Sequence, residues 1–83
     1  MNNRIRWACR RGMLELDLFL LPFFDKMYST LDTKDQNAFV ILLREKDPDL
    51  LAYLMGHATI ENPECEGIVE KIRSFKRGGT SVT

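Results

Sequence analysis

Turn-forming residues divide this chain into short stretches in which apolar side chains recur every three to four positions. The breaks lie at Gly12, at "LDTKDQ" (31–36), at "DPD" (47–49), and between Gly56 and "NPE" (62–64). That spacing is the period of a helix with one buried face, and no stretch alternates as a half-buried strand would. The pattern predicts an all-α fold, a compact bundle of five short helices.

The expected helices cover residues 4–10, 13–28, 34–46, 48–55 and 63–77. The second is apolar on most sides, with Leu14, Leu18 and Leu21 on one face, which predicts a central buried helix. Pro22 lies inside it and cannot donate to the carbonyl of Leu18, so we expect a kink or a short break there.

Helix starts are marked by residues whose side chains accept hydrogen bonds from backbone N–H groups. Thr33 and Gln36 have the spacing of a capping box, in which each side chain reaches the other residue's backbone. Asp47 and Asn62 each precede a proline, and proline is favoured at the first helical position. These signals predict N-caps at Thr33, Asp47 and Asn62.

The chain has 83 residues, a length suited to one small domain, which we expect over residues 1–77. The last segment, "GGTSVT" (78–83), has nothing to bury and is expected to be disordered. A domain of this size has little room for a deep substrate cavity, which disfavours an enzyme.

Charge and hydropathy exclude several classes of partner. Lysine and arginine number 12, as do aspartate and glutamate, whereas nucleic-acid and membrane-surface binders normally carry excess positive charge. The apolar run "LFLLPFF" (18–24) is far shorter than the ~20 residues that span a bilayer. Cys9 and Cys65 match no zinc or redox spacing and are read as reduced thiols. We expect a cytoplasmic protein.

A search for catalytic residues finds no convincing set. His57 is the one histidine and follows the predicted helix end at Gly56, where a capping or surface role is the ordinary explanation. There is no glycine-rich phosphate loop and no metal-binding motif. Asp47 and Asp49 look like paired carboxylates, but both are explained as helix-start residues.

The segment "RWACRRGMLELD" (6–17) concentrates charged residues directly before the most apolar stretch of the chain, residues 18–24. Each residue has an ordinary explanation: Arg11 and Glu15 can form an ion pair one turn apart, Trp7 can be a core residue, and Gly12 can cap a helix. The combination favours a surface that docks another protein, because tryptophan and arginine are enriched in binding hot spots. Binding of RNA to the arginines is a weaker alternative, since Glu15 and Asp17 would repel phosphates.

This segment, together with "PFF" (22–24) and "DPDLLAYLMGH" (47–57), resembles the SdhE family, the FAD assembly factors of succinate dehydrogenase. The resemblance implies a five-helix bundle and a chaperone-like role rather than an enzymatic one. Such a factor promotes covalent attachment of FAD to a histidine of the flavoprotein subunit of succinate dehydrogenase and, in some bacteria, of fumarate reductase. It implies that the partner handles FAD and forms the bond itself, and that the factor holds no cofactor tightly.

The family signature R-G-x-x-E is matched by Arg11, Gly12 and Glu15, and neighbouring family positions by Trp7, Arg10, Asp17 and His57. The resemblance implies that these residues bind the partner. Leu51 and Tyr53 depart from the family pattern, which often has aromatic residues there, and both keep an apolar body. Three alternatives stay open: an antitoxin-like regulatory binding protein acting on the cytoskeleton, a small RNA-binding regulator, and a small flavin-binding protein, against which the lack of a nucleotide cradle argues.

Overall fold

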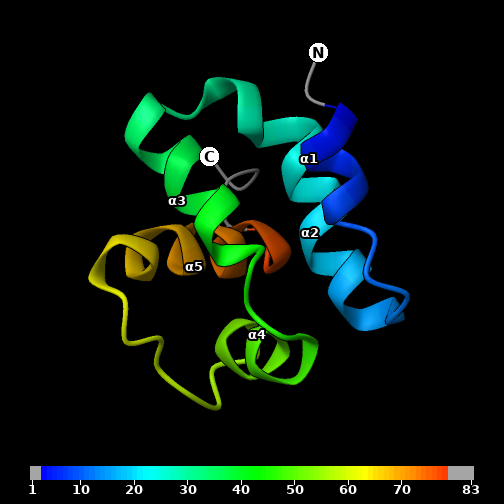
Figure 1. Cartoon of the computed structure of the whole chain (residues 1–83), viewed down its shortest axis with the longest axis vertical. Helices are drawn as coiled ribbons and strands as arrows, with labels where there is room; N and C mark the ends of the chain where they lie inside the picture. The colour runs from blue at the N-terminus through cyan, green and yellow to red at the C-terminus, as the bar shows by residue number, and fades with distance from the viewer. Residues whose placement is uncertain (1–2, 79–83) are drawn as a thin grey trace.

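The computed structural model describes residues 3–78, and all regular structure within that range is helical (Figure 1). The elements are α1 (Asn3–Ala8), α2 (Leu14–Met27), the 3-10 turn η1 (Tyr28–Thr30), α3 (Thr33–Leu42), α4 (Asp47–Leu54) and α5 (Pro63–Lys76). The predicted all-α fold with five helices is confirmed. No helix within residues 3–78 is long and apolar enough to cross a bilayer.

Helix α5 is the centre of the bundle. It packs against α2, α3 and α4, while α1 lies along α2 at the edge of the molecule (Figure 1). The aromatic rings of Phe23 on α2 and Phe75 on α5 meet edge to face at 5.7 Å, and Phe39 on α3 lies 5.8 Å from Phe23. These contacts join α2, α3 and α5 through one apolar core.

The three-to-four spacing of apolar residues predicts one buried face on each of α3, α4 and α5, and the structure buries these faces, with Leu51 and Phe75 only partly covered. The buried members are Phe39, Leu42, Leu43, Leu50, Leu54, Cys65, Ile68, Val69 and Ile72. Their three-to-four spacing placed them correctly because a short helix against a core has one covered side.

The prediction that α2 is buried on most sides is wrong. Leu16, Leu20 and Phe23 are buried, but Leu14 and Leu18 are 72% and 47% exposed. Helix α2 packs against α4 and α5, and Leu16, Leu20 and Phe23 belong to the core, whereas Leu14 and Leu18 stay exposed. Pro22 causes no break in α2, because it lies on an exposed side where water can hydrate the carbonyl of Leu18.

Two predicted helix caps are displaced by one residue. Asp32, not Thr33, caps α3 and accepts from the N–H of Asp35, since aspartate is the stronger capping residue. Lys46, not Asp47, precedes α4, which frees the Asp47 carboxylate for a tertiary contact. Asn62 caps α5 as predicted and accepts from the N–H of Glu64.

The chain end is only partly described. Gly78 closes the last turn after α5, where its N–H donates to the carbonyl of Phe75 at 2.9 Å. The rest of the predicted tail, residues 79–83, lies outside the described residues. The prediction of one domain over residues 1–77 stays a prediction.

Candidate docking site

The link between α1 and α2, residues 9–13, has a defined conformation. Gly12 has φ +79°, in the left-handed region that side chains rarely adopt, and a Cβ there would meet nothing within 4 Å. The N–H of Arg11 donates to Oδ1 of Asp17 at 2.8 Å, which ties the link to the first turn of α2. The link therefore presents bare, exposed backbone at Gly12.

The Arg11 side chain turns into the molecule and is only 14% exposed. Its Nε donates to Oδ1 of Asp47 at 2.9 Å, and Nη2 donates to the carbonyl of Glu45 at 2.7 Å. Its Nη1 donates to the carbonyls of Leu43 at 2.7 Å and Ala8 at 3.2 Å. One guanidinium thus joins the end of α1, the α3–α4 turn and the start of α4, and we call these contacts the Arg11 anchor.

The ion pair that helix spacing allowed between Arg11 and Glu15 is not formed. Glu15 is exposed in the first turn of α2, and its carboxylate makes no hydrogen bond or ion pair with any residue in the range 3–78. The motif therefore divides: Arg11 is occupied within the chain, whereas Gly12 and Glu15 face outward.

Trp7 and Arg10 form an exposed pair beside this motif. The indole is 71% exposed, so the possibility that Trp7 is a core residue is wrong. The guanidinium carbon of Arg10 lies 5.6 Å from the centre of the Trp7 ring, a cation–π geometry. Trp7 on α1 and Arg10 in the link after it therefore form an exposed surface that is both aromatic and positively charged.

Arg6 is held by an acid that sequence analysis missed. Its Nε and Nη2 donate to the two carboxylate oxygens of Asp25 at 2.8 and 3.0 Å, and this hydrogen-bonded pairing lowers the pKa of Asp25. Two arginines of the segment 6–17, Arg6 and Arg11, are thus each paired with an acid, Asp25 and Asp47 respectively. Each lies too far from its arginine in the sequence for a local pattern to reveal the pairing.

His57 lies apart from the contacts described so far. It is exposed in the turn after α4, where Gly56 has φ +80° and the N–H of His57 donates to the carbonyl of Ala52. Its side chain forms no hydrogen bond or ion pair with the motif residues in the described part of the chain. Of the predicted site residues, Arg11 thus contacts Asp17 and Trp7 contacts Arg10, whereas His57 contacts none of these four.

Both cysteines are free and buried. Burial raises the pKa of the Cys9 thiol to about 12, an effect larger than the opposing influence of the Arg11 and Arg6 charges. Burial also raises the pKa of Cys65. A thiol with so little thiolate is a poor nucleophile, so Cys9 serves as a packed apolar side chain at the start of the link.

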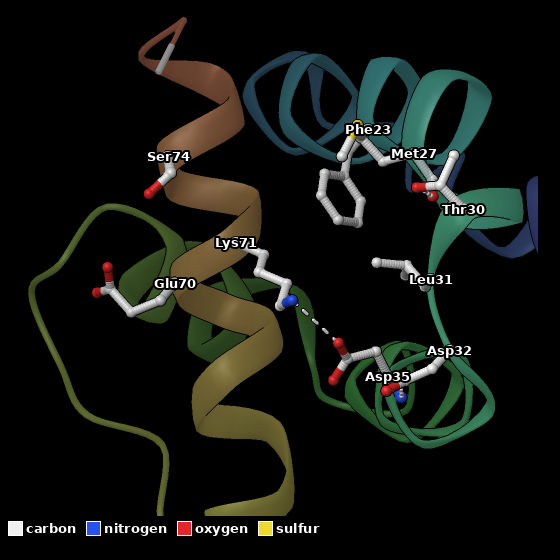
Figure 2. Close-up of a pocket in the computed structure, with 9 residues that line it drawn as sticks. All are labelled: Phe23, Met27, Thr30, Leu31, Asp32, Asp35, Glu70, Lys71 and Ser74. Atoms are coloured by element: carbon white, nitrogen blue, oxygen red, sulfur yellow. Dashed lines mark hydrogen bonds and ion pairs between the residues drawn. The ribbon is translucent and has the colours of Figure 1, made fainter. Parts of the chain in front are cut away.

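A groove of about 530 Å³ lies between α2, α3 and α5 (Figure 2). Phe23 and Leu31 point into it, and Nζ of Lys71 reaches across to Oδ2 of Asp35 at 3.1 Å (Figure 2). Asp32 and Glu70 also line it. None of the predicted site residues does, so this groove is separate from the candidate docking site.

Sequence analysis also missed an apolar surface beside Glu15. Leu18 on α2 and Met55 after α4 are exposed, and with Phe19, Glu15 and Lys76 they line a hollow of about 200 Å³. The sequence does carry a signal for an exposed apolar surface, because α2 has more apolar residues than one buried face can hold. Without the packing, nothing in the sequence indicates which of its faces stays open.

Comparisons with known proteins identify a family that matches most of the chain. The model of a protein family described as "Flavinator of succinate dehydrogenase" matches residues 3–76. The chain is similar to the FAD assembly factor SdhE of Vibrio cholerae, 51% identical over 69 residues that cover 83% of this chain and 80% of the relative. It is 49% identical to the protein of that name from Photobacterium profundum over 83% and 78% of the two chains. The Shewanella oneidensis protein of that name is 47% identical over 84% and 85%.

Proposed function

The chain belongs to the Sdh5 family, the flavinators of succinate dehydrogenase, and from that premise we propose that it binds the flavoprotein subunit of succinate dehydrogenase and promotes covalent attachment of FAD there. The observation that carries the proposal is the divided motif. An anchored Arg11 holds in place a bare Gly12 and an unpaired, exposed Glu15.

Each motif residue then has a distinct task. Gly12 allows a partner backbone to approach the link closely, because a Cβ at this position would project into open space. Glu15 offers a carboxylate to a basic group of the partner, and Trp7 with Arg10 offers an aromatic and cationic contact. Arg11 positions these groups through its contacts with Asp47 and the backbone, and Asp17 fixes the link.

FAD itself, in this proposal, stays on the flavoprotein, which forms the bond. The groove in Figure 2 supports this view, since three carboxylates line it and its one lysine, Lys71, already pairs with Asp35 rather than being free to hold a diphosphate. Binding acts by favouring one conformation of the flavoprotein, through higher affinity for it, and by orienting the reacting groups.

The test compares two glutamates that each lie in the first turn of a helix and are exposed. Glu15→Gln removes the proposed contact on α2, and Glu66→Gln makes the same change on α5. We expect both to melt like the unsubstituted protein, while Glu15→Gln binds the apo-flavoprotein about tenfold more weakly. Titration measures the affinity, and in-gel flavin fluorescence measures covalent FAD.

Two results would contradict the proposal. One is an unsubstituted protein that neither binds the apo-flavoprotein nor increases its covalent flavin. The other is a folded Glu15→Gln variant that binds and supports flavinylation as well as Glu66→Gln does.

A further inference from the structure

Large exposed apolar side chains lie on α1, on α2 and just after α4. Within residues 3–78 they are Trp7, Leu14, Leu18 and Met55, with exposures of 71%, 72%, 47% and 40%. Leu14 and Leu18 are one turn apart on the same face of α2, and Leu18 and Met55 line the same hollow. We call Leu14, Leu18 and Met55 the apolar strip, and a contiguous strip of this kind marks an interaction surface.

The hollow within the strip has the size and lining of a socket for one side chain. Its volume is about 200 Å³, below the roughly 300–1,000 Å³ of sites that hold small molecules and cofactors. Leu18, Met55 and Phe19 supply apolar walls, and Nζ of Lys76 lies 5.7 Å from the centre of the Phe19 ring. Glu15 and Lys76 put one acid and one base on the rim.

The strip is continuous with the candidate docking site because Glu15, a residue of that site, also lines the hollow within the strip. It lines the hollow and is also the outward carboxylate of the motif, directly after Leu14 in α2. A partner that reached Glu15 would therefore come within reach of Leu18, which lines the same hollow. If the strip stayed in water in that complex, its exposed apolar side chains would lie directly beside the interface and their burial would contribute nothing to binding.

We propose that the apolar strip is part of the surface that binds the flavoprotein, and that the hollow receives one apolar side chain of it. A basic group beside that side chain would face Glu15, and an acidic group would face Lys76. This inference rests on the proposed function, and it adds a hydrophobic centre to an interface otherwise described by polar residues.

The groove in Figure 2 is a weaker candidate for a docking surface than the apolar strip. Its charged groups are already satisfied within the chain: Lys71 pairs with Asp35, Arg73 pairs with Glu70 at 2.9 Å, and Asp32 caps α3. The apolar strip, by contrast, adjoins a Glu15 carboxylate that has no partner among residues 3–78.

The test uses two double variants at the same positions. Leu14→Gln with Leu18→Gln keeps side-chain length and removes apolar character, whereas Leu14→Met with Leu18→Met keeps both. Both leucines are exposed, so each variant should fold and melt like the unsubstituted protein. We expect the glutamine variant to bind the apo-flavoprotein at least about tenfold more weakly and the methionine variant to stay within about threefold.

The outcomes separate this inference from the proposed function. If the unsubstituted protein binds and the glutamine variant binds equally well, the apolar strip is not part of the interface, although the proposed function stands. If the unsubstituted protein does not bind, both fail. Sedimentation of the isolated proteins should show the same monomer for all variants. A dimer that only the glutamine variant loses would make a second copy the occupant and overturn the inference.

Discussion

Arg11 and Glu15 are one helical turn apart in the sequence, yet they lie in opposite environments. The guanidinium of Arg11 donates to Asp47 and to three backbone carbonyls and is 14% exposed. The carboxylate of Glu15 is exposed and has no partner within residues 3–78. One short motif thus combines an internal anchor with an outward contact. A loss of function on replacing Arg11 would not by itself show that Arg11 touches a partner.

Removing the anchor should have the largest effect. Arg11→Ala leaves Asp47 without its ion pair and the partly buried carbonyls of Leu43 and Glu45 without the donor that Arg11 supplies. We expect the free energy of unfolding to fall by about 2–4 kcal/mol, because partly buried polar groups lose their partners. The Tm should fall by roughly 10–20 °C in a thermal melt followed by circular dichroism.

Arg11→Lys separates the contribution of the positive charge of Arg11 from that of its several hydrogen bonds. Lysine can keep the charge pair with Asp47 but cannot serve several acceptors with a planar fork, so we expect an intermediate loss of stability. Glu15→Gln should leave the Tm unchanged. If Arg11→Ala melts at the temperature of the unsubstituted protein, the anchor does not stabilise the fold.

Replacing Gly12 should lower the free energy of unfolding by a smaller amount than replacing Arg11. Gly12→Ala forces a side chain into the left-handed region without any steric contact, so the free energy of unfolding should fall by about 1 kcal/mol. Gly67→Ala is the matched control, because Gly67 lies inside α5 with open space around it. There alanine should raise the free energy of unfolding by about 0.5–1 kcal/mol. Urea titration measures both changes, and equal effects of the same sign would refute this assignment.

Gly12→Trp extends this test from stability to binding. The space beside Gly12 is open, so the variant should fold with a loss of stability close to that of Gly12→Ala. It should also block the close approach of a partner. Normal flavinylation by the folded variant would exclude contact at Gly12.

The exposed pair of Arg6 and Asp25 should matter least. Arg6 lowers the pKa of Asp25, so the pair stabilises the folded state at neutral pH, and this stabilisation is lost as the pH falls through the lowered pKa. Asp25→Asn should therefore slightly reduce stability at pH 7 and flatten its dependence on pH below about pH 4. Urea titrations at pH 7 and pH 3 measure the difference. An unaltered dependence on pH would show that the pair contributes nothing in solution.

Local patterns in the sequence determined most of the fold. The three-to-four spacing identified the buried faces of α3, α4 and α5, and Asn62 before Pro63 marked the start of α5. Such signals act within about one helical turn, where side-chain and backbone positions follow directly from residue order. They also located the charged segment 6–17 as the candidate site.

Only the tertiary structure decided how that segment is used. It turned Arg11 inward to Asp47 and the α3–α4 turn, paired Arg6 with Asp25, and left Leu14 and Leu18 uncovered on α2. Each result depends on segments far apart in the sequence, whose meeting is set by packing of the whole core. Helical periodicity states which residues share a face, but a face is buried or open only once the other helices have docked.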